Sequence, residues 1–337
     1  MAKSLLSLDE YVQGVLRRDP VILARAVTLV ESTASQHRPL AQEMLEKLLP
    51  HSGKAIRVGI SGVPGAGKST FIERFGKNLC SAGHRVAVLA IDPSSSLSGG
   101  SILGDKTRME ELSRDPNAFI RPTPSSGTLG GVARKTRETM LVCEAAGFDV
   151  ILVETVGVGQ SESTVRWLVD FFLLLMITGA GDELQGFKKG IIELADAIVI
   201  NKADGDNTTP AERLKGEFNQ VLGFFSPVTP GWTPRAYTCS ARSGAGIEQI
   251  WEVITSFQKA MRLSGVFEER RRQQLVQWME ALVVEGFRER FLGSASVQQR
   301  YEQARHDVAA GKLSATAAAE QLLETSCPFV AQKQSDK

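Results

Sequence analysis

The fold of this chain of 337 residues is decided by the stretch IRVGISGVPGAGKS, residues 56–69. Its first six residues form an apolar run that predicts a buried strand, and a glycine-rich turn and a helical pattern follow. From Gly62 to Ser69 the sequence fits the pattern GxxxxGK[ST], in which backbone N–H groups and a helix N-terminus surround phosphate oxygens. Strand, loop and helix in this order predict a phosphate-binding loop.

Five further apolar runs follow and predict an α/β fold. They cover residues 86–91, 149–155, 171–177, 197–201 and 236–240. The runs are continuous rather than alternating, which is typical of strands that are buried on both faces. We therefore expect a mostly parallel sheet flanked by helices, with ligands bound at the carboxyl ends of its strands.

Helical patterns lie on both sides of these runs. Residues 1 to about 50 have apolar side chains at helical spacing, and after about residue 260 no strand pattern remains. We predict an N-terminal helical extension (1–52), a P-loop domain (53–262), a C-terminal helical region (263–331) and a frayed polar tail (332–337).

Each part of the loop has a task in binding phosphate. Lys68 reaches the β- and γ-phosphates and is a candidate catalytic residue, while Ser69 offers a hydroxyl to Mg²⁺. We assign nucleotide binding to Gly62, Val63, Pro64, Gly65, Ala66, Gly67, Lys68, Ser69 and Thr70. This loop alone does not distinguish ATP from GTP.

The segment Asn201-Lys202-Ala203-Asp204 does distinguish them, because it follows the run 197–201 directly and matches the pattern NKxD. A carboxylate at Asp204 can accept hydrogen bonds from two donors of guanine that adenine lacks, and an unpaired buried acceptor costs roughly 1–3 kcal/mol. The stem of Lys202 can stack on the base. Backbone N–H groups of Ser240, Ala241 and Arg242 could contact guanine O6. The expected ligand is GTP or GDP.

Three acidic residues are candidates for a magnesium site with Ser69. Asp92 follows the run 86–91, Asp105 lies in the loop beyond it, and Glu154 lies near the end of the run 149–155. Carboxylate oxygens are the ligands that Mg²⁺ prefers, so we predict metal-binding and catalytic roles for these acids.

The segment from Glu154 to Gly157 stands where many GTPases have DxxG, a loop that responds to the γ-phosphate. Val158 follows Gly157 where Ras-like enzymes have a glutamine, and the nearest glutamine is Gln160. We therefore expect slow intrinsic hydrolysis that a partner accelerates.

Composition excludes several other classes of protein. The chain has 39 Lys and Arg against 38 Asp and Glu, a net charge of +1, which is no basis for general binding to nucleic acid or membranes. Its four cysteines and four histidines lack the spacing of a local zinc site. No signal peptide and no membrane-length apolar run are found. These features favour a cytoplasmic protein.

The motifs together resemble one family. GVPGAGKST, IDPSSSLSGGSILGDKTRM, ETVGVGQSE, GAGDELQGFKKGIIELAD and NKAD are similar to motifs of the MeaB/ArgK GTPases, relatives of the human methylmalonic aciduria type A protein. The resemblance runs from about residue 20 to 300 and places the chain in the SIMIBI class of P-loop proteins. It implies a homodimeric GTPase that gates cofactor loading of adenosylcobalamin-dependent methylmalonyl-CoA mutase and protects that enzyme.

The resemblance also implies particular roles for residues. It suggests that Asp92, Asp105 and Glu154 serve Mg²⁺, and that Gln185 and Lys188 lie in a nucleotide-sensitive loop that contacts the partner. We expect the helix 268–292 to bury its apolar row, Leu275, Met279, Leu282, Phe287 and Phe291, across a subunit interface. The alternative is packing against the chain's own N-terminal helices.

Two other functions remain as alternatives. One is a hydrogenase- or urease-type maturation GTPase, which would carry the clustered Cys or His ligands that this chain lacks. The other is a nucleotide-dependent kinase of an amino-acid transport component, for which no evident acceptor site is found among the residues. Transfer of label from a γ-labelled nucleotide to an acceptor would separate a kinase from a hydrolase.

Overall fold

A computed structural model describes residues 5–92, 109–124, 129–155, 165–179 and 189–326. The chain forms two compact units, residues 1–274 and 275–337. The helix α12 (Val266–Gly293) belongs to both units. None of the helices in the described part of the chain has the length and hydropathy that a membrane span needs.

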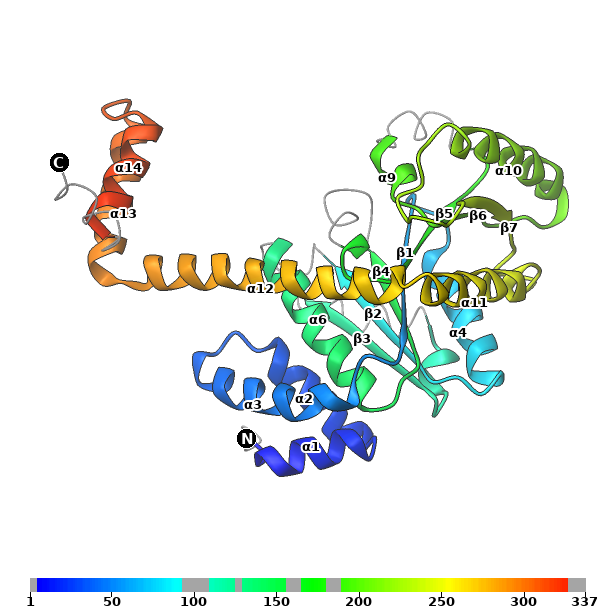
Figure 1. Cartoon of the computed structure of the whole chain (residues 1–337), viewed down its shortest axis with the longest axis horizontal. Coiled ribbons are helices and arrows are strands. Elements are labelled where there is room, and N and C mark those ends of the chain that lie inside the picture. The colour runs from blue at the N-terminus through cyan, green and yellow to red at the C-terminus, as the bar shows by residue number, and fades with distance from the viewer. Residues whose placement is uncertain (1–4, 93–108, 125–128, 156–164, 180–188, 327–337) are drawn as a thin grey trace. The chain divides into compact units, whose positions relative to one another are not determined.

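A seven-stranded parallel sheet forms the centre of the first unit (Figure 1). The strands lie in the order β3-β2-β4-β1-β5-β6-β7. Their bounds are β1 (Ile56–Gly62), β2 (Val86–Asp92), β3 (Ala118–Pro124), β4 (Val150–Thr155), β5 (Phe171–Met176), β6 (Ala197–Ile200) and β7 (Arg235–Thr238). Every residue of β4, β5 and β6 is buried, as expected for strands with both faces covered. The predicted fold class is confirmed.

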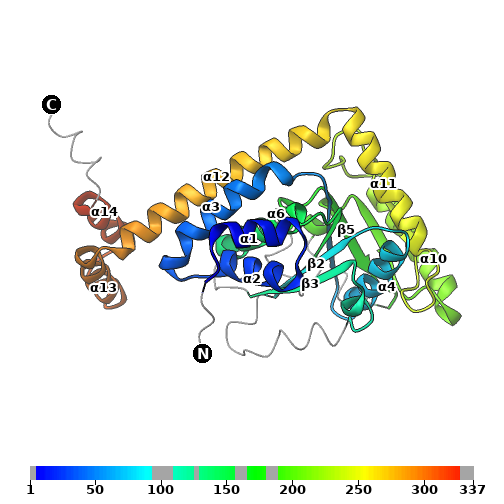
Figure 2. The same ribbon diagram turned by 90° about the horizontal axis from the view of Figure 1, so that it is seen from below.

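Helices flank this sheet (Figure 2). The helix α4 (Lys68–Ser81) packs on β1 and β2 and against α11 (Ile247–Leu263), while α6 (Leu129–Ala145) packs on β2 and β3. The N-terminal helices α1 (Leu8–Leu16), α2 (Pro20–Glu31) and α3 (Arg38–Leu48) pack against α6. The helix α10 (Thr208–Leu222) packs on β6 and β7, and α9 (Lys189–Glu193) is a short helix before β6. Single 3₁₀ turns are η1 (Ser35–His37), η2 (Leu49–His51), η3 (Leu112–Arg114) and η4 (Gly205–Asn207).

The strand β3 was not predicted, because its sequence AFIRPTP lacks a continuous apolar run. It contains two prolines, Pro122 and Pro124, which have no N–H to donate to a neighbouring strand. The sheet tolerates them because β3 is an edge strand that pairs only with β2. Arg121, in the middle of the strand, forms an ion pair with the buried Glu31 of α2, so this polar position holds an N-terminal helix on the sheet edge.

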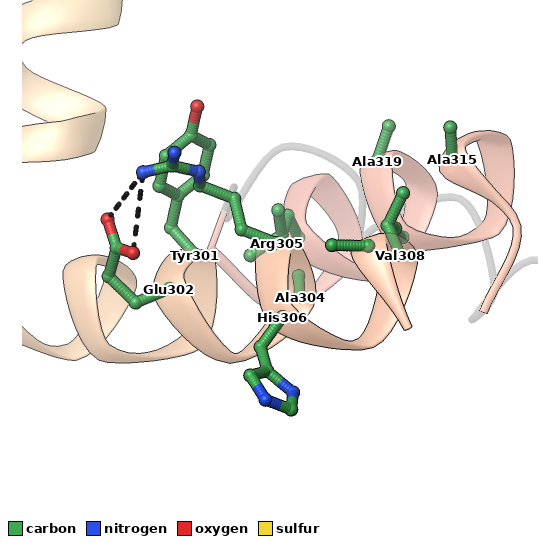
Figure 3. A pocket seen from close by; sticks show the side chains of 11 residues that line it. Tyr301, Glu302, Ala304, Arg305, His306, Val308, Ala315 and Ala319 are labelled. Atoms are coloured by element: carbon green, nitrogen blue, oxygen red, sulfur yellow. Dashed lines mark hydrogen bonds and ion pairs between the residues drawn. The ribbon is translucent and has the colours of Figure 1, made fainter. Parts of the chain in front are cut away.

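The second unit contains the remainder of α12 with α13 (Ala295–Ala309) and α14 (Ala315–Ser326). The last two helices pack against each other. A cavity of about 700 Å³ lies between them, and small residues such as Ala304, Ala315 and Ala319 line much of it (Figure 3). At one end Arg305 forms an ion pair with Glu302 at 3.2 Å.

Candidate nucleotide-binding site

The phosphate loop begins where β1 ends, and its glycines permit a path that other residues could not follow. A Cβ atom on Gly62 would lie 2.3 Å from the carbonyl oxygen of Leu175 in the neighbouring strand β5. Gly65 and Gly67 have φ angles of 76° and 80°, in the left-handed region that favours glycine. The chain therefore passes close to β5 and turns sharply before it enters α4.

Lys68 is the first residue of α4, and its ammonium group lies back over the loop. Its Nζ atom donates to the carbonyl oxygen of Gly62 at 2.9 Å and to that of Val63 at 3.4 Å. The positive charge is thus held beside the loop, next to the N-terminus of α4, whose helix dipole also attracts anions. A cation and a helix N-terminus side by side are features that attract phosphate groups.

Two of the predicted magnesium-site residues lie together. The Ser69 hydroxyl donates to Glu154 Oε1 at 3.1 Å, although the two residues are 85 positions apart. The register of the sheet explains this contact, because Glu154 lies opposite Ile60 near the carboxyl end of β1, just before the loop. Glu154 is 5% exposed. A hydroxyl and a buried carboxylate side by side are hard oxygen ligands that suit Mg²⁺.

The positions of several other predicted site residues relative to Ser69 and Glu154 lie outside the described structure. Asp105, Gly157, Gln160, Gln185 and Lys188 lie outside the described residues. The backbone of Asp92 ends β2, but its side chain also lies outside the described part of the structure. In the ranges that the structure does describe, no three Cys, His, Asp or Glu side chains form a cluster that could hold a metal.

Asn201 joins the phosphate loop to the predicted base-binding segment. Its side chain is 1% exposed, and its Nδ2 atom donates to the carbonyl oxygen of Ala66 at 2.8 Å. Its Oδ1 atom accepts from the backbone N–H of Ala241 at 3.0 Å. The sequence identified Asn201 only as the first residue of the NKxD pattern. The structure shows that it connects three loops at the carboxyl ends of β1, β6 and β7.

The carboxylate of Asp204 lies next to the turn after β7. The Ser240 hydroxyl donates to Asp204, and the backbone N–H of Ser243 donates to the same hydroxyl at 3.0 Å. Ser240 is fully buried, whereas Asp204 is only partly buried and remains open to a ligand. The hydroxyl therefore orients the carboxylate before any base arrives.

Lys202 adopts a left-handed backbone conformation, with φ of 62°, which is uncommon for a residue with a side chain. Asn207 stabilises this turn by donating from Nδ2 to the Lys202 carbonyl oxygen at 2.7 Å. The side chain of Lys202 is exposed. Its Cε atom lies 3.9 Å from the position that a Cβ atom on Gly67 would take, so the side chain extends toward the phosphate loop.

Arg74 is a functional candidate that the sequence did not reveal. It lies on α4 and donates to the carbonyl oxygens of Ala241, at 3.3 Å, and Arg242, at 2.9 Å. These two bonds hold the turn after β7 from the side of the phosphate loop. No local pattern could have identified Arg74, because its partners lie more than 160 residues away in the chain.

Comparisons with known proteins agree with this geometry. A family model described as methylmalonyl-CoA mutase-associated GTPase MeaB matches residues 23–296. A putative GTPase of Caulobacter vibrioides is 52% identical over 318 residues, which cover 94% of this chain and 97% of the relative. The mitochondrial methylmalonic aciduria type A homolog of Mus musculus is 48% identical over 327 residues, which cover 94% and 79% of the two chains.

Two further comparisons concern proteins with a different kind of name. The GTPase ArgK of Escherichia coli is 46% identical over 297 residues, which cover 88% of this chain and 90% of the relative. A crystal structure described as an LAO/AO transport system kinase matches with a TM-score of 0.75 and 39% identity. That match covers 96% of this chain and 99% of the other.

Proposed function

The chain belongs to the MeaB family of methylmalonyl-CoA mutase-associated GTPases, and from this membership we propose that it binds GTP with Mg²⁺ and hydrolyses it to GDP and phosphate. We further propose that it assists an adenosylcobalamin-dependent methylmalonyl-CoA mutase, by gating cofactor loading and protecting the enzyme. The observation that carries the nucleotide assignment is the position of Asn201, which bonds to both the phosphate loop and the turn beside Asp204.

Guanine recognition rests on Asp204 and the turn after β7. The Ser240 hydroxyl leaves the second oxygen of the Asp204 carboxylate and further lone pairs available to accept from guanine. Of the three backbone N–H groups predicted to contact guanine O6, that of Ser240 donates to the Ala245 carbonyl oxygen at 2.9 Å and that of Ala241 donates to Asn201. We therefore propose the N–H of Arg242 as the donor to O6, an acceptor that guanine has where adenine has an amine. A site built to pair with these groups rejects the analogue that lacks them, because its own polar groups would stay unpaired.

Phosphate binding and hydrolysis rest on Lys68, Ser69 and Glu154. In the proposed complex the Lys68 ammonium leaves the carbonyl oxygens of Gly62 and Val63 and binds β- and γ-phosphate oxygens. Ser69 and Glu154 would hold the metal, together with Asp92 and Asp105. When bound, Mg²⁺ neutralises charge on the phosphate oxygens.

A phosphate-release assay tests these assignments. Lys68→Ala is expected to reduce GTP hydrolysis to background, while Lys54→Ala, which removes an exposed lysine before β1, should leave the rate unchanged. Glu154→Gln is expected to raise the Mg²⁺ concentration needed for half-maximal hydrolysis more than it weakens GDP binding. If Lys68→Ala hydrolyses GTP at the wild-type rate, the site assignment is wrong.

The name of the crystal structure described as a transport system kinase favours a second candidate function, transfer of the γ-phosphate to an acceptor. A γ-labelled GTP assay separates the two. A GTPase releases labelled inorganic phosphate in the absence of any acceptor, whereas a kinase releases little until its acceptor is added and then labels it.

The partner proposal is supported by the description of the matching family and by the methylmalonic aciduria type A relative. A loop near the γ-phosphate can differ in free energy between GTP and GDP states, and a partner that prefers one state responds to that difference. We propose that residues 180–188, with Gln185 and Lys188, and the segment with Gly157 and Gln160 form this responsive surface. A pull-down from cell extract with GDP and with a non-hydrolysable GTP analogue tests for a nucleotide-dependent partner.

We also propose a cytoplasmic homodimer. The part of α12 in the second unit exposes Leu275, Met279, Val283, Val284 and Phe287, each by more than half of its surface. Contiguous exposed apolar side chains of this kind are typical of protein interfaces. A second copy of the chain would cover this row, and the predicted interface residue Leu282 is partly buried beside it.

A further inference from the structure

A second cavity lies in the first unit, near the amino ends of β5 and β6, whereas the phosphate loop lies at the carboxyl end of β1. Its volume is about 490 Å³, within the range of small-ligand sites. Asp170 and Asp196, which directly precede β5 and β6, accept hydrogen bonds from the lining residues Arg270 and Arg166. The phosphate loop and Asn201, in contrast, follow the strands. The cavity is therefore separate from the proposed nucleotide site.

Two arginines that line this cavity share one hydrogen-bond partner. Arg166 Nη2 and Arg270 Nη2 both donate to the Thr229 hydroxyl, at 2.9 and 2.5 Å. The hydroxyl in turn donates to Asp196 Oδ1 at 2.5 Å. Burial lowers the pKa of Arg270, and the neighbouring charge of Arg166 lowers it further. Two guanidinium groups thus share one neutral oxygen, an arrangement that an additional anion would stabilise.

The carboxylates of this region are already engaged by other groups. Asp196 forms an ion pair with Arg166 at 3.1 Å and accepts from the Phe172 N–H at 2.9 Å. Asp170 accepts from Arg271 Nη2 at 2.6 Å and Nε at 2.8 Å. Three arginines therefore face two carboxylates.

Arg270 is the arginine left with neutral acceptors. Apart from Thr229, its Nη1 atom donates to the backbone carbonyl oxygen of Asp170 at 2.5 Å. Among the residues that the structure describes, no carboxylate forms an ion pair with Arg270. The charges of Asp170 and Asp196 act on Arg270 from nearby, but these carboxylates bond directly to Arg271 and Arg166. A ligand carboxylate would give Arg270 a directly bonded counter-charge.

The lining of the cavity combines these polar groups with apolar side chains and with the start of a helix. Trp167 and Val228 line it and are 53% and 42% exposed, so a ligand could cover them. Ser264, Gly265 and Val266 at the N-terminus of α12 also line it, and this end of a helix attracts anions. Glu269 is also a lining residue, and it accepts from the exposed Arg272 and Gln273, each at 3.0 Å.

We propose that this cavity binds an organic monoanion, a carboxylate with an apolar body. Arg270 lines the cavity and bonds only to neutral acceptors, and a guanidinium fork pairs with a carboxylate through two hydrogen bonds. The indole of Trp167 and the side chain of Val228 would cover the apolar body. The site is independent of the nucleotide and adds a ligand class that the proposed GTPase activity does not require.

Binding of 3-phenylpropionate to the full-length protein, measured by calorimetry and tryptophan fluorescence, tests the proposal. We expect saturable binding of the acid, with 3-phenylpropan-1-ol and inorganic phosphate each at least ~10-fold weaker, because they lack the carboxylate or the apolar body. Arg270→Gln should lower the affinity for the acid by ~10-fold or more. The control Arg213→Gln removes the same charge from an exposed position on α10, away from the lining of the cavity, and should leave the affinity for the acid within about 2-fold.

Two further measurements keep the test decisive if Arg270→Gln does not fold. Gln273→Glu adds a negative charge at an exposed position of the lining. It should lower the affinity for the acid and leave the affinity for the alcohol unchanged. Glu269→Gln removes the carboxylate of the lining and should strengthen binding of the acid. GDP affinity, unchanged in every variant, shows that the nucleotide site is intact. The proposal is overturned if the alcohol binds as tightly as the acid, or if no saturable binding occurs up to about 20 mM.

Discussion

The side chain of Asn201 donates a hydrogen bond to the carbonyl oxygen of Ala66, at 2.8 Å, across the gap between β6 and the phosphate loop. This bond connects the segment that is proposed to bind the base with the loop that is proposed to bind the phosphates. Arg74 makes a second connection, since it reaches from the helix after the loop to the turn at Ala241 and Arg242. The two halves of the site are therefore held in one geometry before a nucleotide binds.

Arg74→Ala is expected to lower the affinity for GDP by about 10-fold or more, because hydrogen bonds from a charged donor contribute about 1.5–3 kcal/mol. The affinity for ADP should change by less than about 2-fold, since adenine cannot bind to the turn that Arg74 holds. Calorimetry with both nucleotides measures this ratio. Lys77→Ala, on the same helix with an exposed partner in Glu111, is the control and should alter neither affinity. An equal loss for GDP and ADP would indicate a general structural effect instead.

Asp204 is expected to determine the choice of base. Wild-type protein should bind GDP at least ~100-fold more tightly than ADP, and Asp204→Asn should lose most of that preference, because an amide presents a donor where guanine also has donors. Asp206→Asn makes the same charge change on the neighbouring 3₁₀ turn η4 and should behave like the wild type. Comparable affinity of the wild type for GDP and ADP would refute the guanine assignment.

The buried pair of Asp170 and Arg271 predicts a pH dependence of stability. Burial acts to raise the pKa of Asp170, but Arg271 outweighs it, and the native pKa lies below the ordinary value of 3.8. A depressed native pKa means that the stabilisation is fully present above that ordinary value and is lost as pH falls through the native pKa. Urea unfolding of the wild type should therefore show a loss of stability in acid.

Asp170→Asn tests the origin of this dependence. At pH 7 it should lower the free energy of unfolding by about 3–5 kcal/mol, because Arg271 is left without its buried counter-charge. The difference from the wild type should shrink as pH falls below about 4, where the carboxylate of the unfolded chain takes up a proton, and should be lost once pH falls through the native pKa of Asp170. Asp206→Asn, at an exposed position, is the control. A difference that does not depend on pH would exclude the proposed ion-pair contribution.

The exposed apolar row of α12 predicts a dimer. Met279→Glu and Val283→Glu change side chains that are 58% and 64% exposed in the single chain, so neither should disturb its fold. Each is expected to convert a dimer to a monomer in sedimentation at micromolar concentration, because an interface core excludes unpaired charge. Glu280→Gln, at an exposed position on the same helix, should leave the dimer intact. A wild-type monomer under these conditions would contradict the homodimer proposal.

Much of the fold could be predicted because buried parallel strands have a direct signature in the sequence. The runs at 56–61, 171–177 and 197–201 are continuous apolar stretches, and each corresponds to a strand of the sheet. The strand β3 escaped prediction for a physical reason. An edge strand needs only one set of ladder hydrogen bonds, so it can hold Pro122 and Pro124, which mimic a loop in sequence.

The candidate site could be predicted only in its local motifs. Spacing within the chain identified Lys68, Ser69, Asn201 and Asp204, because the phosphate loop and the NKxD segment are continuous. The bonds from Asn201 to Ala66 and from Arg74 to Arg242 join segments that are 135 and 168 residues apart. Contacts of this kind depend on strand order, which no single motif contains. The same holds for the pairing of Arg166 and Arg270 on Thr229.

The most direct test of the proposed function is the rate of GTP hydrolysis with and without a purified methylmalonyl-CoA mutase. We predict slow hydrolysis alone and a faster rate in the complex, with nucleotide affinity altered in the same proportion as mutase affinity, since linkage is reciprocal. The double variant Gln185→Ala, Lys188→Ala should keep GDP affinity but lose the stimulation. A mutase that neither binds nor accelerates hydrolysis in any nucleotide state would contradict the partner proposal. Only the GTPase assignment would then remain.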